Sequence, residues 1–269
     1  MPELPEVETV RRQLHDRISG KTIREVLVFK TGRETPLGEK FVQAVVGRKL
    51  KGVERRAKVL VFRFDDGAIL GHLKMTGSFV FVNKKYSPTK HDRMLFVFSG
   101  DTRLIWSDVR MFGYLKVVTP DELTAALSAY GPEPLEASVG ALADRLQRKS
   151  MRSIKATLLD QTVIAGIGNI YADEALHRAG VRPTRATNKV TADERLRLAK
   201  DIKNVLTESL AQKGTSANDY IDTEGQKGGF LAFLRVYGRG GEPCRTCQRP
   251  IMKTVVAQRG THYCAYCQK

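Results

Sequence analysis

Cysteine is absent from the chain before Cys244, and only four cysteines occur in all 269 residues. Disulfides distributed along the chain are therefore excluded. No apolar run reaches the ~18 residues that a membrane-spanning helix requires. The opening segment MPELPEVETV also lacks the apolar stretch of a secretory signal. We therefore expect a cytoplasmic protein that has no membrane partner.

Acidic residues are the second scarce class. Only 29 Asp and Glu stand against 45 Lys and Arg, which gives a formal net charge of +16. An apolar fraction of 42% and a charged fraction of 28% of mixed sign do not fit a disordered chain. Such an excess of positive charge indicates a polyanionic partner, and nucleic acid is the first candidate.

The four cysteines form two CxxC pairs in the last part of the chain. Cys244 and Cys247 are separated from Cys264 and Cys267 by 16 residues. This spacing is typical of a tetrathiolate zinc site, and the alternative, a pair of disulfides, would need an oxidising compartment. We predict one structural Zn²⁺ ion, which would stabilise a tail too short to bury a core of its own.

The first half of the chain begins with a helical pattern and continues with strand-like segments. Residues 3–19 carry apolar residues at helical spacing, and Gly20 follows as a stop signal. Short β-branched and aromatic runs separated by turn signals follow up to Val118, which favours a sandwich or barrel. The clearest runs are residues 58–64, 78–82, 94–98 and 115–118.

The second half has a helical period and ends in the cysteine-rich tail. Gly131-Pro-Glu-Pro-Leu135 interrupts any continuing element, so we predict a linker at 131–136. Helices are expected at 138–149, 151–162, 170–179 and 191–212, then a glycine-rich loop at 225–229 and a β-like segment at 251–257. The expected domains are 1–130, 137–228 and 229–269.

Positive charge is concentrated in two places. Residues 235–269 hold seven basic residues and one acidic residue, Glu242. An acid-free basic run opens the helical part, with Arg145, Arg148, Lys149, Arg152 and Lys155. One such run alone is more often a solvated surface. Two runs, one of them on a zinc module, favour contacts with phosphates.

The amino terminus carries groups that could react. Methionine before proline is normally excised, and excision would leave Pro2 with a free secondary amine. Such an amine can attack a sugar C1′ and form an iminium intermediate. Glu3 and Glu6 lie close enough in sequence to face the amine and transfer protons. The alternative is that both glutamates only complement the positive end of a helix dipole.

Further motifs, taken together with the opening block, resemble a known family. The chain is similar to the formamidopyrimidine-DNA glycosylases, and the motifs occur in the family's order over nearly the whole chain. They begin with Met1-Pro-Glu-Leu-Pro-Glu-Val-Glu8, Arg55-Arg-Ala-Lys58, His72-Leu-Lys-Met75, Asp108-Val-Arg-Met-Phe-Gly113 and Gly131-Pro-Glu-Pro134. They continue with Asp160-Gln161, Ala165 to Glu174, Val236-Tyr-Gly-Arg239 and Gln258 to Cys264.

The resemblance implies an architecture and an activity. The fold would be α+β, with an amino-terminal helix and β-sandwich, then a helical helix-two-turn-helix domain with a β-hairpin zinc finger. The activity would be that of a bifunctional glycosylase and abasic-site lyase in base excision repair. Members act on damaged double-stranded DNA, chiefly on 8-oxoguanine and formamidopyrimidines. We expect a monomer.

The resemblance also implies catalytic roles. Pro2 would be the nucleophile, Glu3 the proton donor and Glu6 a supporting carboxylate. Lys58 occupies the position of the family's proton donor in β-elimination. Arg259, between the zinc knuckles, would bind the phosphates of the lesion nucleotide and act in δ-elimination. From its sequence context alone, Arg259 is only a phosphate contact, because guanidinium groups bind phosphate with two hydrogen bonds.

DNA contacts are implied in the same way. Asn169 follows Gly166-Ile-Gly168 in the segment that matches the family's helix-two-turn-helix element. Arg152, Lys155 and His91 would make further contacts. The family's void-filling trio corresponds to Met75, Arg110 and Phe112, which would occupy the space of an extruded base. For Met75 and Phe112, the alternative is an ordinary place in the apolar core.

One departure from the family pattern and two other functions remain open. Asn218-Asp219 stands where many family members have an arginine–threonine pair in the loop that caps the damaged base. The alternatives are an endonuclease VIII-like glycosylase for oxidised pyrimidines and a non-catalytic zinc-dependent DNA-binding protein. Leu4 disfavours the first, since that group has glycine there. The joint presence of Pro2, Glu3, Lys58 and Arg259 disfavours the second, since a protein that only binds DNA needs none of them.

Overall fold

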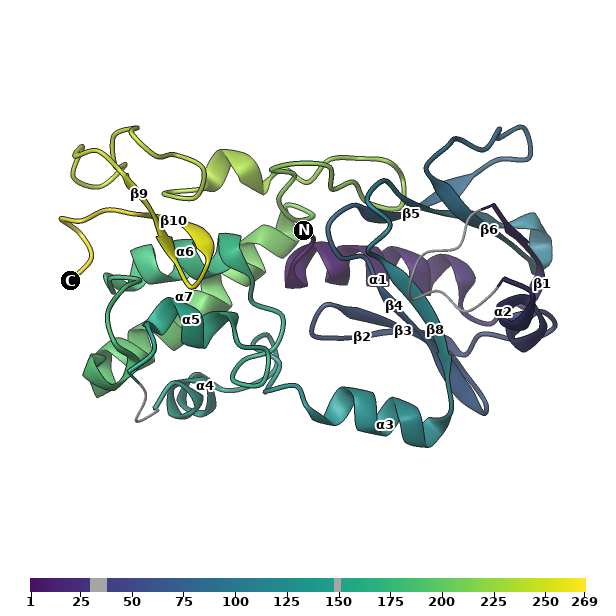
Figure 1. Cartoon of the computed structure of the whole chain (residues 1–269), viewed down its shortest axis with the longest axis horizontal. Helices are drawn as coiled ribbons and strands as arrows, with labels where there is room; N and C mark the ends of the chain where they lie inside the picture. Colours follow the sequence, from purple (N-terminus) through teal and green to yellow (C-terminus); the bar gives the residue numbers. More distant parts are fainter. Residues whose placement is uncertain (30–37, 148–150) are drawn as a thin grey trace. The chain divides into compact units, whose positions relative to one another are not determined.

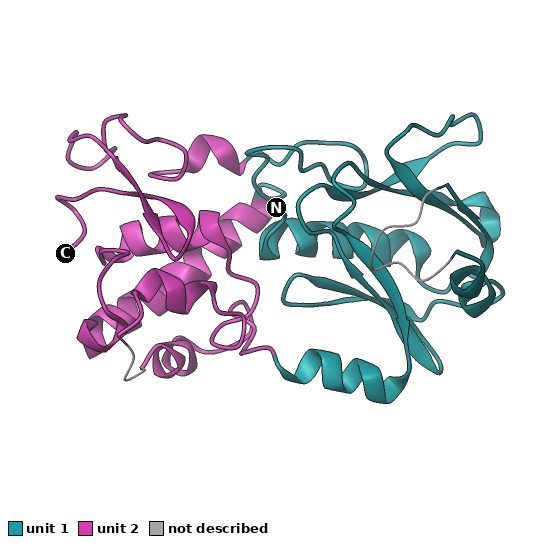
Figure 2. Ribbon diagram, in the orientation of Figure 1, with its two compact units in different colours: residues 1–129, 212–229 teal, residues 130–211, 230–269 magenta. Residues whose placement is uncertain are grey.

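The computed structural model describes residues 1–29, 38–147 and 151–269. Two compact units are present (Figure 2). The amino-terminal unit comprises residues 1–129 and 212–229, and the carboxyl-terminal unit comprises residues 130–211 and 230–269. The first unit thus recruits a segment from late in the chain.

Helix α1, Leu4–Ile18, opens the amino-terminal unit (Figure 1). Pro5 fits its first turn, where the missing N–H needs no partner. The helix ends at Ile18, and Gly20, two residues on, has a φ of +76° that suits glycine. Its apolar stripe is fully covered and consists of Leu4, Val7, Val10, Leu14 and Ile18. The helical pattern expected at 3–19 is confirmed.

Two four-stranded antiparallel sheets follow α1. One has the order β1-β6-β7-β5 and the other β2-β3-β4-β8. The strands of the first sheet are β1 (Ile23–Val28), β5 (Gly77–Val82), β6 (Asp92–Phe98) and β7 (Arg103–Asp108). The strands of the second are β2 (Gly52–Arg56), β3 (Val59–Phe64), β4 (Gly67–His72) and β8 (Tyr114–Val118). These strands include all four runs expected from the sequence.

One apolar core joins both sheets to α1. Phe62 of β3, Phe79 of β5 and Trp106 of β7 belong to it, and Leu14 comes from the helix. The ring centroids of Phe62 and Phe79 are 5.6 Å apart at an edge-to-face angle. Burial of such side chains between two sheets is what holds a sandwich together. The expected β-sandwich is therefore confirmed.

Two helices of this unit were not expected from the sequence. Helix α2 spans Gly38–Val45 and helix α3 spans Pro120–Ser128. Thr119 and Glu122 form a capping box at the start of α3, and Pro120 takes its first position. That signal was readable in Thr119-Pro-Asp-Glu122, directly after the last strand-like run.

The carboxyl-terminal unit contains the four expected helices, of which three are shorter than expected and α6 begins one residue earlier. They are α4 (Val139–Arg145), α5 (Ile154–Leu159), α6 (Asn169–Ala179) and α7 (Ala192–Ala211). Ser138 and Ser153 cap α4 and α5, because their hydroxyls accept from amides three residues on. Arg148 and Lys149 lie outside the described residues.

The tail forms a two-stranded hairpin of β9 (Met252–Val256) and β10 (Arg259–Tyr263). The β-like segment expected at 251–257 is therefore one strand of a pair. Short 3-10 turns occur at Ser99–Asp101, Thr187–Lys189 and Phe230–Phe233. Across the described ranges, no helix combines the length and apolarity needed to cross a bilayer.

The expected domain limits remain a prediction, but two segments are informative. Residues 131–136 pack closely: a β-carbon on Gly131 would lie 2.5 Å from the carbonyl oxygen of Val163. The ammonium group of Lys203 donates to the carbonyls of Pro134 and Leu135. Residues 212–229 group by their contacts with the amino-terminal unit, although residues 212–228 were expected in the helical domain and residue 229 in the zinc finger.

Candidate functional site

The amino terminus places two buried carboxyl groups at the start of α1. Pro2 is buried, and so are Glu3, which is 3% exposed, and Glu6, which is 1% exposed. Glu3 is the N-cap residue of the helix. Unpaired N–H groups at a helix start favour negative charge nearby. Burial together with this position gives the amino terminus the surroundings of a reactive site.

Glu6 bridges α1 to the 212–229 segment. One oxygen, Oε2, accepts from the Glu3 amide at 2.7 Å, and Oε1 accepts from the Thr215 amide at 2.7 Å. Gly214 lies against the same carboxylate, since a β-carbon there would come within 2.8 Å of Oε1. The bridge orients Glu6 by backbone groups on both sides, which suits the supporting role expected for it.

The remainder of the 212–229 segment is anchored on α1 through Gln13. Its side chain accepts from the Thr223 amide at 3.0 Å and donates to the Asp222 carboxylate at 2.9 Å. Asp222 in turn accepts from the amides of Glu224 and Gln226 and closes the glycine-rich turn. These anchors were not predictable from the sequence, because no local pattern links Gln13 to a residue 209 positions later.

Asn218 and Asp219 are exposed at the tip of this segment. The base of the tip is fastened by Ser216, whose hydroxyl donates to the Tyr220 carbonyl at 2.7 Å and accepts from the Gly228 amide at 2.9 Å. Tyr220 is itself part of the apolar core. Asn218 and Asp219, which depart from the family's common pattern, thus lie in solvent on a loop whose base is fixed by hydrogen bonds.

Lys58 lies in the two-residue turn between β2 and β3 and is 7% exposed. The register of the next hairpin pairs Val59 with His72, so the turn lies beside the end of β4. The His72 Nδ1 accepts from the Lys74 amide at 2.9 Å. Burial, reinforced by the charges of Lys74 and Lys58, lowers the pKa of His72 to about 3.

His72 is therefore a neutral imidazole with Nε2–H as its donor. In the sequence, His72 is only one residue of the motif His72-Leu-Lys-Met75. Its place at the end of a strand, three residues before the motif's methionine, was the available signal. A neutral donor next to Lys58 adds a second hydrogen-bonding group to this part of the amino-terminal unit.

Met75, Arg110 and Phe112 are exposed on the surface of the amino-terminal unit. Met75 is 38% exposed and Phe112 51%. The guanidinium carbon of Arg110 lies 5.0 Å from the centroid of the Phe112 ring. A core location, the alternative for Met75 and Phe112, is thereby contradicted. Large apolar side chains kept in solvent indicate a binding surface.

The loop that carries Arg110 and Phe112 is organised by Asp108. This carboxylate is 1% exposed and accepts from the Gly113 amide at 2.7 Å and the Arg110 amide at 3.2 Å. The backbone amide of Asp108 donates to the carbonyl of His91 at 3.0 Å. His91, half-buried, therefore lies beside the start of the same loop.

In the carboxyl-terminal unit, Asn169 is the first residue of α6 and reaches the hairpin. Its side-chain amide donates to the Gly260 carbonyl at 2.8 Å. The preceding turn has Gly166 at φ +81°, and the Gln161 side chain accepts from the Gly166 amide at 2.8 Å. Gly168, the N-cap, offers no side chain to the first amides of α6. Such a helix start is suited to an anion.

Lys155 is completely enclosed by protein groups. Its ammonium group contacts the Asp173 carboxylate at 2.6 Å and the Thr261 hydroxyl at 2.7 Å. Asp173 also accepts from the His262 amide at 2.9 Å. This buried pair fastens β10 to α6. A contact between Lys155 and a phosphate stays a prediction that would require the side chain to move.

Arg259 begins β10 at the tip of the hairpin and is exposed. The two turn residues, Ala257 and Gln258, both have positive φ values, +50° and +59°. Such a turn matches the twist of two-residue hairpins. Arg152 is also exposed, and its guanidinium is engaged with Asp160 at 3.1 Å. The side chain of Arg259 is therefore accessible to a DNA phosphate, as the expected contact requires.

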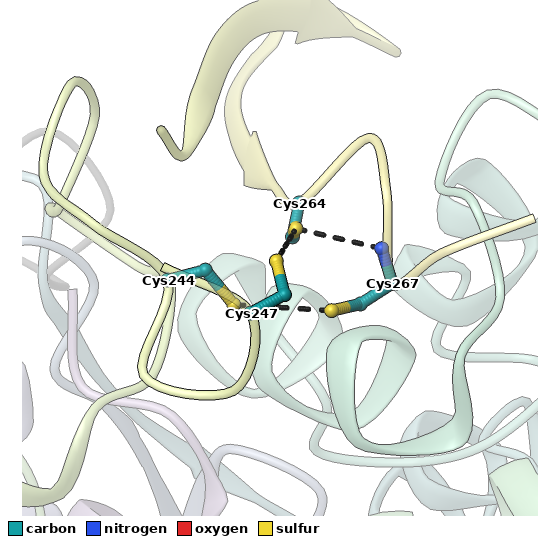
Figure 3. A group of neighbouring side chains, drawn as sticks. All are labelled: Cys244, Cys247, Cys264 and Cys267. Carbon is teal, nitrogen blue, oxygen red and sulfur yellow. Dashed lines mark hydrogen bonds between the residues drawn. The ribbon is translucent and has the colours of Figure 1, made fainter. Parts of the chain in front are cut away.

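The four cysteine sulfurs face one another at the other end of the hairpin (Figure 3). All lie within 4.8 Å of one another, with 3.5 Å between Cys247 and Cys264 and 4.0 Å between Cys244 and Cys267. Sulfurs around tetrahedral zinc, each ~2.3 Å from the ion, are ~3.8 Å apart. Backbone amides also donate to Cys244 and Cys264, which supports thiolates. The site fits one structural zinc ion.

Family models match three consecutive parts of the chain. The formamidopyrimidine-DNA glycosylase N-terminal domain matches residues 1–115, and the H2TH domain of the same enzymes matches residues 130–220. A zinc finger found in FPG and IleRS matches residues 241–269. The chain belongs to the formamidopyrimidine-DNA glycosylase family.

Individual members of the family are similar over their full length. The formamidopyrimidine-DNA glycosylase of Geobacillus kaustophilus is 42% identical over 275 residues, covering 100% of both chains. A Lactococcus lactis Fpg variant bound to DNA containing Fapy-dG superposes with a TM-score of 0.92 at 35% identity and full coverage of both chains. The wild-type Lactococcus lactis enzyme with DNA containing an oxidised pyrimidine superposes with a TM-score of 0.90 at 36% identity, again over both whole chains.

Membership in the formamidopyrimidine-DNA glycosylase family bears out two expectations directly. The helix-two-turn-helix domain and the zinc finger predicted from the motifs are those of the family models. The zinc-finger match covers all four cysteines, so the tetrathiolate centre is the family's zinc site.

Proposed function

We propose that this protein is a bifunctional DNA glycosylase and abasic-site lyase of base excision repair that removes oxidised purines from duplex DNA. The observation that carries the proposal is the buried Pro2–Glu3 pair at the start of α1 in a full-length member of this family. After excision of Met1, the Pro2 nitrogen is a secondary amine. The positive end of the helix dipole favours its uncharged, nucleophilic form.

The first reaction replaces the bond to the base by a bond to the protein. The Pro2 nitrogen attacks C1′ of the damaged nucleotide, the C1′–N bond breaks, and the base leaves with the electron pair and a proton. Glu3 protonates the ring oxygen as the sugar opens, and loss of the amine proton completes the iminium. A positioned general acid accelerates such a step by about 10²–10⁴-fold.

The second reaction breaks the strand. Loss of a C2′ proton from the iminium expels the 3′ phosphate, with Lys58 as the proton donor in this β-elimination. A further elimination expels the 5′ phosphate, and Arg259 assists by binding that group in two hydrogen bonds. Hydrolysis of the remaining iminium releases an unsaturated aldehyde and restores Pro2.

DNA is bound through its phosphates by both units. In the carboxyl-terminal unit, the start of α6 with Asn169 and the hairpin tip with Arg259 provide donors for phosphate oxygens. In the amino-terminal unit, His91, Lys58 and Arg110 add hydrogen-bond donors for the DNA. The net charge of +16 supports strong binding that weakens steeply with salt.

Extrusion of the damaged base explains why Met75, Arg110 and Phe112 are exposed. Removing a base from the stack costs a few kcal/mol, and a wedge must fill the gap. Phe112 is the ring that inserts between base steps, Arg110 pairs with the orphaned base, and Met75 packs against the remaining space. All three side chains are exposed, and Asp108 fixes the loop that carries Arg110 and Phe112. Both observations support this role, because a wedge must be both accessible and held.

Purines rather than pyrimidines are the proposed lesion class. Leu4 and the complete Met75, Arg110 and Phe112 set favour this choice. One structure of the Lactococcus lactis enzyme, a variant, contains Fapy-dG DNA, and another, of the wild type, contains oxidised-pyrimidine DNA. Activity on oxidised pyrimidines is therefore the second candidate. Asn218 and Asp219 lie on the segment where the two substrates would be distinguished.

Borohydride trapping tests the proposal. Duplex DNA carrying 8-oxoguanine opposite cytosine is incubated with the protein and borohydride, and we expect a covalent adduct that maps to Pro2. Absence of both adduct and strand cleavage would leave the non-catalytic DNA-binding protein as the better description, and an adduct on a lysine would refute the amino-terminal mechanism. A thymine-glycol duplex compares the pyrimidine class.

Glu3→Gln supplies the matched variant. This isosteric change removes the proton while keeping the shape and the helix cap. We expect base excision to fall by about 10²–10⁴-fold while DNA affinity is retained. Retained excision would show that another group donates the proton.

A further inference from the structure

Glu8 of α1 is the centre of a charge cluster that includes Arg55 of β2 and lies outside the reactive residues. Glu8 accepts hydrogen bonds from Arg11 at 2.8 Å, Arg12 at 2.9 Å and Arg55 at 3.0 Å. The side chain of Arg55 is only 5% exposed and that of Glu8 11%. Burial opposes ionisation of Glu8, but the bonds from Arg11 and Arg12 and the charges of Arg11 and Arg55 outweigh it and keep its pKa below the ordinary value.

Arg55 makes a second contact that leads to Lys58. Its Nη1 donates to the carbonyl oxygen of Ala57 at 2.7 Å. Ala57 and Lys58 are the two residues of the turn between β2 and β3. Arg55 therefore links a carboxylate on α1 to the turn that carries Lys58.

The first residue of that turn, Ala57, is in a conformation that L-residues avoid. Ala57 has φ +53° and is completely buried, although its β-carbon disfavours the left-handed region. Its carbonyl belongs to the peptide group that joins Ala57 to Lys58. A hydrogen bond on this oxygen fixes the plane of that peptide, and so the direction in which the chain enters Lys58.

Both contacts require the shape of a guanidinium group. Two nitrogens of one rigid plane bind Glu8 and Ala57 at the same time, which a lysine ammonium at the end of a flexible stem does not reproduce. A useful contrast lies on the same two strands. Arg63 of β3 bonds Glu54 of β2 at 2.9 Å, but their side chains are 35% and 55% exposed.

We propose that Arg55, held by Glu8, is a positioning residue for Lys58 in the strand-cleavage step. Arg55 sets the orientation of the β2–β3 turn, and the turn sets where the lysine ammonium delivers its proton. The proposal rests on the proposed function, because it assumes that Lys58 serves β-elimination. Attack by Pro2 does not use this turn, so loss of Arg55 separates the two steps.

The test uses the full-length zinc-loaded protein and duplex DNA with a preformed abasic site. Two quantities are measured in single turnover: the yield of borohydride-trapped adduct and the rate of strand cleavage. The variants are Arg55→Gln, Arg55→Lys and Glu8→Gln, and Arg63→Gln is the exposed control. Thermal unfolding is recorded for each.

We expect Arg55→Gln to slow cleavage by about 10- to 100-fold while trapping stays within about twofold of the unaltered protein. Arg55→Lys keeps the charge and should recover part of the rate. Glu8→Gln should give a smaller loss, and Arg63→Gln should change neither quantity.

Three results would overturn the proposal. Cleavage by Arg55→Gln could match the Arg63→Gln control, or trapping and cleavage could fall by the same factor, which a purely structural role produces. If Arg55→Gln does not fold, normal cleavage by both Arg55→Lys and Glu8→Gln has the same meaning. An unaltered protein that neither traps nor cleaves would instead refute the proposed function.

Discussion

The two units hold their functional residues by different physical means. Pro2 and Glu3 stand on a helix whose apolar stripe is part of a core shared with two β-sheets. Arg259 stands on a hairpin next to a small apolar cluster. Its buried members, among the described residues, are Val236, Cys244, Ile251 and Cys264. Hydrophobic burial secures the first site, whereas a metal and a buried ion pair secure the second.

Each part of the reaction should therefore be lost through a different structural change. Chemistry at the amino terminus should survive changes in the tail, as long as DNA is still delivered. DNA binding by the tail should fail when its metal or its buried charge is lost, because too little apolar surface remains to hold the hairpin. The following experiments test that division, beginning with the largest effect.

Removal of zinc should have the largest effect. Structural zinc contributes about 10–16 kcal/mol of apparent binding energy in small modules, so metal-free protein should lose the folded tail and most of its DNA affinity. Trp106, the only tryptophan, is buried in the sandwich and reports on the other unit. Its fluorescence should be unchanged. Full DNA affinity in protein shown to be metal-free would contradict the division.

Lys155→Met should come next. It leaves the buried Asp173 carboxylate without its cation, and breaking such a pair costs about 3–5 kcal/mol. Hydrogen exchange should accelerate at the β10 amides of Thr261 and His262. Lys200→Met, on the exposed face of α7, is the control. Equal protection in both variants would show that the pair does not hold the hairpin.

Gly214→Ala should disturb the amino-terminal site by a smaller amount. Its φ of +91° disfavours any β-carbon, and the new carbon would lie 2.8 Å from Glu6 Oε1. We expect a loss of about 1–3 kcal/mol in stability together with slower base excision.

Gly225→Ala is the control that separates the backbone strain of Gly214→Ala from its clash with Glu6. Gly225 has a similar φ of +76°, yet a β-carbon there would meet nothing within 4 Å. It should therefore lose stability without slowing excision. If both variants excise at the same rate, the Glu6 bridge does not matter to the chemistry.

Arg259→Gln should give the smallest thermodynamic change. Loss of one phosphate contact makes the slope of log affinity against log salt less negative by about 0.9. Affinity is measured by titration at several salt concentrations. Arg249→Gln, whose guanidinium stacks over Tyr266, serves as the control on the same module. A slope unchanged by Arg259→Gln would remove this residue from the phosphate contacts.

Local patterns predicted much of the fold and the metal site. Helix α1, the four strand runs and the tetrathiolate cluster follow from periodicity and spacing, which are properties of neighbouring residues. The capping box at Thr119 was equally local and was overlooked. Arrangements that depend on distant residues were not predictable, such as the enclosure of Lys155 by Asp173 and Thr261.

By itself, the sequence determined the chemical groups: a proline amine next to glutamate, four thiols at zinc spacing and a surplus of 16 positive charges. Only the tertiary structure decided which groups are exposed and which are held. It exposes Phe112, buries Lys155, and brings residues 212–229 against α1 through Glu6 and Gln13. The physical reason is that burial and long-range hydrogen bonds depend on which segments the whole chain packs together, and no local pattern records that.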